Sequence, residues 1–339
     1  MISIDGSFGE GGGQIIRSSL ALSLVTGKPF RVERVRAGRD KPGLQRQHLT
    51  AVKAAAEIGR AEVTGANLGS QQFAFRPGPV VAGDYHFSIG TAGSTTLVLQ
   101  TVLPPLMMQE RPSTVILEGG THNVHAPPFE FLARAFLPLV NRTGPTVRAE
   151  LERYGFYPPG GGRLKFTIEP GVTRRRVELL ERGELLAARA VALVVRLPPN
   201  IAERELAVVK ERMGWDDEQL RVATSNNAHS PGNVLTIELE SEQLTEIFTG
   251  VGERGVRAEV VAERAAAEAL RYLSIDAPVG EHLADQLLIP LALTGGGSFL
   301  TGPPSLHTTT NIEIIKRFLA VEITVEPASG GAWKVEVLA

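Results

Sequence analysis

Cysteine is absent from the 339 residues of this sequence. Its absence excludes disulfide bonds, thiolate nucleophiles, and zinc or iron–sulfur sites that depend on cysteine ligands. It also agrees with a cytoplasmic location, which we take as the expectation.

A long uninterrupted apolar run is missing too. The most apolar stretch, TTLVLQTVLPPLMM at 95–108, is interrupted by Gln100 and two prolines. The N-terminus lacks the pattern of a basic segment followed by an apolar one that marks a signal peptide. We therefore expect a soluble protein that is not exported and has no membrane partner. Neither sign of charge dominates, because the formal net charge is −2, so any polyanion site must be a local cluster.

Glycine and proline are abundant, with 36 and 22 residues. Such a composition is typical of many short elements joined by tight turns. The length exceeds that of one typical core, which predicts two domains or one domain with an insertion.

One order of elements occurs three times along the chain. Each unit has a glycine-rich start, an apolar helix, a strand, a loop, a second helix and a final strand. The units cover residues 9–78, 90–171 and 280–339. The third unit begins much later than the spacing of the first two predicts, so we infer an insertion.

The inserted stretch, 184–276, has a pattern of its own. It predicts a strand at 189–197, a helix at 198–214, strands at 220–227 and 232–241, and a helix at 257–273. Alternating charges at 171–187 suit a solvated strand or a linker. We predict an α+β (α/β) fold: a discontinuous three-repeat large domain, 1–183 plus 277–339, with a smaller inserted α/β domain at 184–276.

The stretch GEGGGQ at 9–14 comes directly before an apolar helix. Its backbone N–H groups and the helix N-terminus could bind an anion. It lacks the lysine of a Walker motif, and Gln14 replaces the last glycine of a dinucleotide-binding motif, so a plain turn is an equal alternative. Glu10 favours function, because an acid here could hold a divalent cation that bridges to phosphate.

A basic loop follows the first strand of this unit. Arg36, Arg39 and Lys41 lie between glycine and proline residues, where guanidinium groups could bind a phosphate with paired hydrogen bonds. The alternative is a solvated charged surface.

Two further stretches contain histidines. His122 and His125 have H-x-x-H spacing but no third ligand nearby, so a metal site is disfavoured. A lone histidine such as His307 is more often structural than reactive, although His307 lies at a junction of loop and helix. Asp285 could simply favour the positive end of its helix, or could orient a reactive imidazole.

Taken together, the motifs resemble the RNA 3′-terminal phosphate cyclase family over the whole chain. The similar stretches are DGSFGEGGGQIIRSSLALS, GTAGSTTLVLQTVLP, GGTHNVHAPP, GFYPPGGGRL, VGEHLADQLLIPLAL and SLHTTTNIEIIKRFL. The resemblance implies a large domain of three repeats, as in enolpyruvate transferase-like folds, with a smaller inserted domain.

The resemblance also implies an ATP-dependent ligase that forms a phosphoric ester. In this family a histidine, here His307, takes AMP from ATP and releases pyrophosphate. AMP then passes to the 3′-phosphate of RNA, and the adjacent 2′-hydroxyl displaces it to give a 2′,3′-cyclic phosphodiester. The implied co-substrates and partners are ATP, Mg²⁺ or Mn²⁺, RNA with a 3′-terminal phosphate, and a second copy of the chain in a homodimer.

Site residues follow from the resemblance position by position. His307 and Asp285 are expected to be catalytic, with Asp285 orienting His307. The expected nucleotide-binding residues are Gln100, Pro127, His282, Leu283, Ala284, Asp285, Gln286 and Glu10, of which Glu10 also binds the metal. The expected residues at the RNA end are Arg17, Arg36, Arg39 and Gln47.

Two positions depart from the family pattern: His282 replaces a usual tyrosine, and Tyr154 replaces a usual basic residue. Two other functions remain as alternatives. A non-catalytic cyclase-like protein of ribosome assembly would lack the nucleophilic histidine, which is present here. An enolpyruvate transferase would carry six units, whereas this chain shows three.

Overall fold

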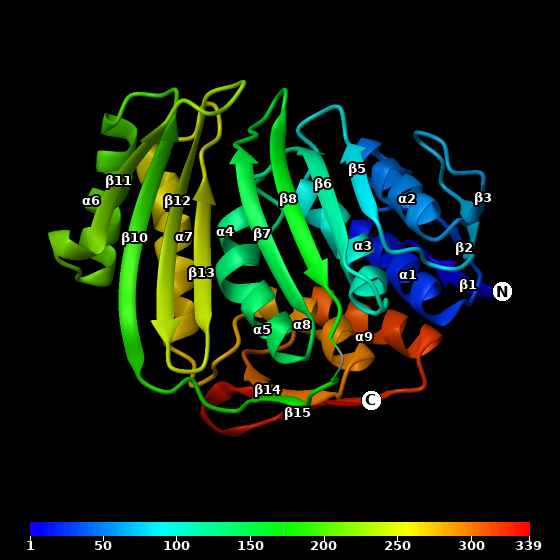
Figure 1. The fold of residues 1–339 in the computed structure, drawn as a ribbon. Helices are drawn as coiled ribbons and strands as arrows, with labels where there is room; N and C mark the ends of the chain where they lie inside the picture. The colour runs from blue at the N-terminus through cyan, green and yellow to red at the C-terminus, as the bar shows by residue number, and fades with distance from the viewer. Residues whose placement is uncertain (172) are drawn as a thin grey trace.

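Three four-stranded sheets share one strand order in the computed structural model, which describes residues 1–171 and 173–339 (Figure 1). The orders are β1-β2-β4-β3, β5-β6-β8-β7 and β9-β14-β16-β15. In each sheet the first two strands are parallel, and the remaining neighbours are antiparallel. The strands are β1 (Ile2–Asp5), β2 (Phe30–Glu33), β3 (Glu62–Thr64), β4 (Phe73–Arg76), β5 (Asp84–Ser88), β6 (Ser113–Gly119), β7 (Thr146–Arg153), β8 (Gly162–Glu169), β9 (Val177–Leu179), β14 (Gly297–Thr301), β15 (Glu322–Pro327) and β16 (Trp333–Leu338).

Two helical segments accompany each sheet. In the first and third units they are α1 (Gly13–Thr26), α2 (Arg46–Ile58), α8 (Glu281–Leu293) and α9 (Leu306–Phe318). The second unit has α3 (Thr95–Met107) and a continuous segment made of α4 (Phe129–Phe131), the π-helix η1 (Leu132–Phe136) and α5 (Leu137–Arg142). The side chains of α1, α3 and α8 are mostly buried, which agrees with their apolar sequences. These three helices therefore form the interior from which the site is built.

The repeated order of helices and strands predicted from the sequence has a counterpart in each unit, but each unit also contains two strands that were not predicted. They are the opening strands β1, β5 and β9 and the strands β3, β7 and β15, of which only β9 was left open, as a solvated strand or a linker. A strand does lie in 171–187, but the expectation that it is solvated is wrong for β9. Val177 and Leu179 are buried, because β9 pairs with β14 inside the third sheet. Residue 172 lies outside the described residues.

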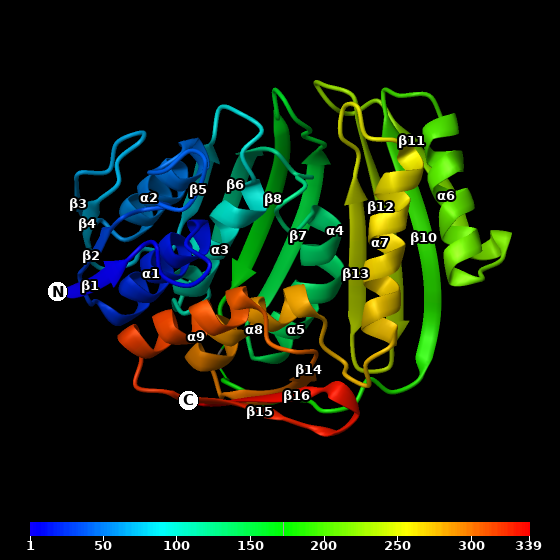
Figure 2. The same ribbon diagram turned by 180° about the vertical axis from the view of Figure 1, so that it is seen from behind.

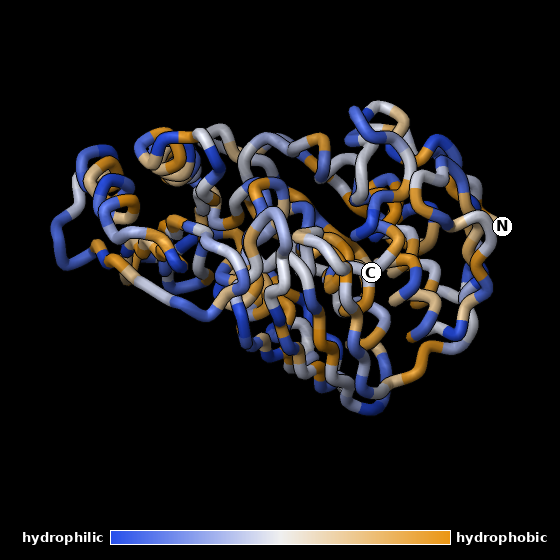
Figure 3. Tube along the Cα trace, turned by 90° about the horizontal axis from the view of Figure 1, so that it is seen from above, coloured by the Kyte–Doolittle hydropathy of each residue, from blue (hydrophilic) through white to orange (hydrophobic). Residues whose placement is uncertain are grey.

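Residues 185–273 form a fourth sheet with its own helices. The sheet has the order β11-β10-β12-β13, from β10 (Leu185–Val195), β11 (Leu220–Ser225), β12 (Gly232–Ser241) and β13 (Thr245–Val251). One face is covered by α6 (Asn200–Met213) and α7 (Ala258–Leu273) (Figure 2). A separate apolar cluster fills the space between helices and sheet. Seen from above, this part extends to one side of the molecule (Figure 3). The division into domains at residues 183 and 276 stays a prediction.

Helix α7 shows why this part folds as it does. Ala262, Ala265, Ala266 and Ala269 are all buried, at the spacing that puts residues on one face of a helix. Small side chains there let the helix pack closely on the sheet. Strand β13 was not predicted, although its sequence TEIFTGV contains the β-branched or aromatic residues Ile247, Phe248 and Val251.

A small aromatic cluster joins the inserted part to the second unit. His122 stacks on Phe156, with ring centroids 5.5 Å apart, and Tyr154 stacks on the same phenylalanine at 6.2 Å. Phe156 also packs with apolar residues of β10 and β12. Tyr154, one of the two departures from the family pattern, therefore lies in a packed junction.

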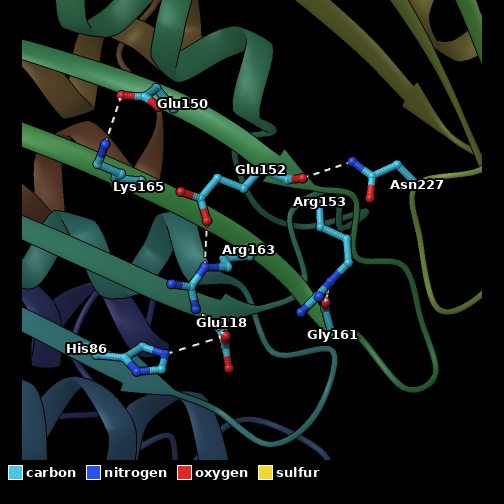
Figure 4. A network of polar contacts seen from close by, with 9 residues as sticks. All are labelled: His86, Glu118, Glu150, Glu152, Arg153, Gly161, Arg163, Lys165 and Asn227. Carbon is cyan, nitrogen blue, oxygen red and sulfur yellow. Dashed lines mark hydrogen bonds and ion pairs between the residues drawn. The ribbon is translucent and has the colours of Figure 1, made fainter.

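The outer face of the second sheet carries charged side chains from neighbouring strands (Figure 4). Arg163 on β8 pairs with Glu118 at 2.6 Å and with Glu152 at 2.5 Å. His86 on β5 is half exposed and lies 3.5 Å from Glu118. Opposite charges on adjacent strands stabilise such an exposed face modestly. Among the described residues, no helix has the length and apolar character needed to cross a membrane.

Candidate active site

Residues from three helix starts meet at one place. The Nε2 atom of Gln14 on α1 donates to Oδ2 of Asp285 on α8, at 2.7 Å. The Oε1 atom of the same glutamine lies 3.1 Å from Nδ1 of His307 on α9. Gln14 thus links the carboxylate to the imidazole, and α1, α8 and α9 all direct their N-terminal ends to this place. Converging helix N-termini favour negatively charged ligands such as phosphates.

The sequence led us to expect that Asp285 orients His307. The structure inserts Gln14 between them, so an orienting effect of Asp285 would act through the glutamine amide. His307 itself follows directly after the helix start, where Ser305 caps α9 by accepting from the Thr308 N–H at 3.2 Å. This cap fixes the first turn of the helix. The His307 side chain is exposed at the surface.

A pocket extends from this place between the helices. The residues that line it are Gln14, Arg17, Ser18, Gln100, Leu103, Pro104, Met107, Phe136, Asp285, Gln286, Ile289, Pro290 and Asn311. Its inner part is apolar and its polar side chains are joined to one another. Arg17 Nε donates to Gln100 Oε1 at 3.1 Å, and Gln100 Nε2 donates to Gln286 Oε1 at 2.9 Å. An apolar slot with few fixed polar groups is typical of a small-molecule site.

The charges of the site act on one another. Burial raises the pKa of Asp285 to about 7, against the opposing effect of the cations His282 and Arg17. Partial desolvation beside the helices lowers the pKa of His307 below its usual range, and the nearby cations Arg17, His282 and Arg39 lower it further. Burial also lowers the pKa of Arg17 to about 10. His307 is therefore a neutral imidazole at pH values near 7, the form that can act as a nucleophile.

The glycine-rich loop is filled by the protein's own side chains. Gly12 donates its N–H to Oε2 of Glu10 at 2.8 Å, and Arg39 pairs with the other oxygen of that carboxylate. A Cβ atom at Gly12 would crowd the ends of the Glu10 and Arg39 side chains, so a larger residue there would displace this pair. Glu10 N–H in turn donates to Thr310 of α9 at 3.0 Å. In this structure the anion in the expected cradle is thus the Glu10 carboxylate.

The side chains of the basic loop and of the other residues expected at the RNA end have different partners. Arg36 has a left-handed backbone, with φ of 53°, and its Nη1 donates to the carbonyl of Gly43 at 3.1 Å. Strained backbone of this kind is concentrated at functional sites. Arg39 reaches Glu10, whereas Gln47 accepts from the Ser94 N–H at 3.0 Å, at the start of α3. Of the expected residues at the RNA end, only Arg17 lines the pocket among the described residues.

Several expected nucleotide-binding residues lie outside the pocket lining. Leu283 and Ala284 are buried in the core. Pro127 is half buried just before α4. The His282 ring is 67% exposed and pairs with Glu268 of α7 at 2.8 Å, so it is already held by a neighbour. The roles of these residues stay predictions.

The sequence reasoning missed residues that complete the polar network. Asn311 donates to the carbonyl of Asp285 at 2.8 Å and accepts from Ser18 at 2.7 Å. Gln14 entered only as a departure from a glycine motif. Gln14 and Asn311 are uncharged residues within helices. The one signal for a role in the site is that each is a polar side chain in an otherwise apolar helical stretch.

The two histidines of the H-x-x-H pair lie in different surroundings. His122 is buried. Its Nδ1 lies 2.8 Å from the Thr121 hydroxyl and its Nε2 lies 2.8 Å from the Glu130 carboxylate, whereas His125 is exposed. Across residues 1–171 and 173–339, no three His, Cys, Asp or Glu side chains are grouped so as to hold a metal ion. A cation at Glu10 would therefore need most of its oxygen ligands from a bound phosphate and from water.

Comparison with known proteins identifies the class of protein to which this fold and site belong. The model of the RNA 3′-terminal phosphate cyclase family matches residues 8–325, and the chain belongs to this family. The family is one of ATP-dependent, ligase-class enzymes.

Similar proteins extend over nearly the full length of the chain. A protein of Koribacter versatilis is 54% identical over 96% of this chain and 92% of its own length. One of Ralstonia nicotianae is 52% identical over 96% and 93%. One of Salmonella typhimurium is 48% identical over 98% and 97%. All three are named RNA 3′-terminal phosphate cyclase.

Proposed function

We propose that this chain uses ATP to convert the 3′-terminal phosphate of an RNA into a 2′,3′-cyclic phosphodiester, with AMP and pyrophosphate as products. The observation that carries the proposal is the exposed His307 ring, held by Gln14 through Nδ1 next to a pocket at three helix starts. Membership of the cyclase family supports the same reaction.

The first step transfers AMP to His307. The lone pair of Nε2 attacks the α-phosphorus of ATP, an N–P bond forms, and the bond to the β-phosphate oxygen breaks as pyrophosphate leaves. The lowered pKa of His307 keeps this lone pair available near pH 7. The N-terminal ends of α1, α8 and α9 and the Arg17 guanidinium stabilise charge on the triphosphate.

The proposed place of the nucleotide base is beside the apolar part of the pocket. Leu103, Met107 and Ile289 line that part, and Gln100 and Gln286 lie at its polar side. Glu10 is the residue that would hold a divalent cation, Mg²⁺ or Mn²⁺, shared with the phosphates. When bound, such a cation neutralises charge on the phosphate oxygens.

The RNA end reacts in two further steps. An oxygen of its 3′-phosphate attacks the phosphorus of AMP, and the N–P bond to His307 breaks. The 2′-hydroxyl then attacks the 3′-phosphorus, loses its proton to solvent, and displaces AMP as the ring closes. Arg17, Arg36, Arg39 and Gln47 are the candidates for holding the RNA phosphate, with the protein acting mainly by positioning and charge neutralisation.

The test is covalent labelling of the full chain. Incubation with ATP labelled at the α-phosphate and a divalent cation should leave label that acid removes and base does not. His307→Ala should abolish it. His86→Ala is the matched control, because His86 lies on the outer face of the second sheet (Figure 4). An unlabelled wild type, or equal labelling of His307→Ala, would contradict the proposed mechanism.

The same preparation distinguishes the non-catalytic alternative. A protein that binds RNA 3′ ends but never turns over ATP would support a role without catalysis. The homodimer stays a prediction that the solution mass of the chain would decide.

A further inference from the structure

Helix α8 begins where the inserted part returns to the large sheets. Gly280, the residue before the helix, has no side chain that could cap it, and the third helical residue is Leu283 rather than an acid. The Gly280 N–H instead donates to Oε1 of Glu246 at 2.6 Å. Glu246 belongs to β13 of the inserted sheet and is only 2% exposed. Glu246 therefore accepts the hydrogen bond from the N-cap backbone that an acid at the third helical position accepts in a capping box.

A second carboxylate of the inserted part reaches the same helical turn. Oε1 of Glu268, on α7, lies 2.8 Å from Nε2 of His282. Glu268 is partly buried, with 27% of its side chain exposed. The first turn of α8 is thus held from the inserted part by Glu246 on its backbone and by Glu268 on a side chain.

The next turn of α8 carries residues of the site. Gln286 donates to the carbonyl of His282 at 3.0 Å and accepts from Gln100 of the pocket. Asp285 is bound by Gln14, which in turn contacts His307. A shift of the first turn would therefore move polar groups on two sides of the pocket.

We propose that Glu246 and Glu268 are positioning residues that hold the start of α8 for nucleotide binding, so that ATP affinity depends on the inserted part. The inserted part contributes none of the described residues that line the pocket. This inference rests on the proposed function, because ATP is taken as the ligand.

Ionisable side chains of both parts face this junction. Glu268, Glu281 and Asp285 favour the charged form of His282. Glu246 interacts with His282 and Glu268, and the phenol of Tyr272, which lies near Glu246 and Arg182, stays neutral because burial raises its pKa. The hydrogen bond to Glu268 raises the pKa of His282 to about 9, so the imidazolium form is present at neutral pH. Arg182 holds the segment between α7 and α8 by donating to the carbonyls of Ile275 and Ala277, at 3.0 and 2.7 Å.

The experiment measures direct ATP binding and amide hydrogen exchange on the full chain. Glu268→Gln removes the charge from a partly exposed residue, and Glu246→Ala removes the cap. Glu246→Gln keeps an acceptor oxygen and serves as the conservative rescue. Glu263→Gln is the matched control, because Glu263 lies on the same helix α7 and pairs with Arg212, both half exposed.

The expected effect is a five- to tenfold rise, roughly, in the dissociation constant of ATP for Glu268→Gln and Glu246→Ala, comparable to the loss of a helix cap. Amides of residues 281–286 should exchange faster in both, even without ATP. Glu246→Gln and Glu263→Gln should stay near wild type. In the wild type, affinity should fall as the pH rises through about 9, where His282 loses its proton. In Glu268→Gln that fall should move towards the usual histidine pKa, near about 6.5.

Unchanged ATP affinity, pH dependence and exchange in Glu268→Gln would overturn the inference, whatever the folding of Glu246→Ala. A wild type that binds no ATP would instead overturn the proposed function. In that case the exchange of residues 281–286 still decides whether the two carboxylates hold α8.

Discussion

The Nδ1 atom of His307 lies 3.1 Å from Oε1 of Gln14. The amide nitrogen of Gln14 donates to Asp285, so its oxygen is left to accept from the ring. Only an imidazole with its hydrogen on Nδ1 can donate to that oxygen, and this tautomer leaves the lone pair on Nε2. The Gln14 amide thus fixes the tautomer and the orientation of the His307 ring, as a directly bonded carboxylate does for many reactive histidines.

Gln14→Met should therefore slow the transfer of AMP to His307 by about 100-fold, the upper end of what the loss of a partner that orients a functional histidine costs. Methionine has a similar length but neither accepts from Nδ1 nor donates to Asp285. Single-turnover labelling with α-labelled ATP measures the rate. Gln109→Met is the matched control, because Gln109 donates to Pro105 at the far end of α3. Transfer at the wild-type rate in Gln14→Met would show that the link is only structural.

The rate of AMP transfer should fall as the pH falls through about 7. Burial raises the pKa of Asp285 to about 7, so its carboxylate becomes protonated there and accepts more weakly from Gln14. The lowered pKa of His307 moves its own titration to more acid pH than that of a free imidazole.

Asp285→Asn tests the assignment of that pH dependence. Asparagine stays neutral at every pH, so the single-turnover rate should be low and flat between about pH 6 and 8. A step near pH 7 that persists in Asp285→Asn would assign the titration to another group.

Much of the fold could be predicted because local patterns and packing agree. The first helix of each unit is apolar around most of its surface, as a helix in the interior must be, and the alanines of α7 repeat at helical spacing. Strand β9 could not be predicted in this way. It has only three residues beside a run of arginines, and it is a buried strand because β14 lies next to it.

The site was only partly predictable for a similar reason. His307 and Asp285 could be selected from motifs, but the residue between them comes from the other end of the chain, 293 positions from His307. The pairing of Glu10 with Arg39 also depends on how two loops meet. Residue type and spacing describe what a side chain can do, whereas its partner is set by tertiary packing.

The inserted part contains a buried acid whose ionisation opposes folding. Glu205 on α6 is fully buried, and its Oε2 accepts from Asn233 at 2.8 Å. Its Oε1 has no hydrogen-bond partner among the described residues. Burial raises the pKa of Glu205 to about 7. An ionised carboxylate with one unpaired oxygen is costly in an apolar environment.

Glu205→Gln should consequently stabilise the protein at high pH. In the unfolded chain this glutamate loses its proton near pH 4.3, roughly, whereas the folded chain keeps it up to about 7. The free energy of unfolding therefore falls as the pH rises from about 4.3 to about 7, and it stays lower at higher pH. The substitution should raise it by up to about 3 kcal/mol at pH 8 and change it little near pH 4.5.

Urea unfolding at the two pH values, followed by the fluorescence of Trp215 in a Trp333→Phe background, measures this difference next to α6. Glu211→Gln is the matched control, because Glu211 is an exposed acid on the same helix. Removing the charge of Glu211 should change the free energy of unfolding only slightly, because an exposed charge is solvated in both the folded and the unfolded chain. The same gain at both pH values, or an equal gain in Glu211→Gln, would show that the buried charge of Glu205 is not the cause.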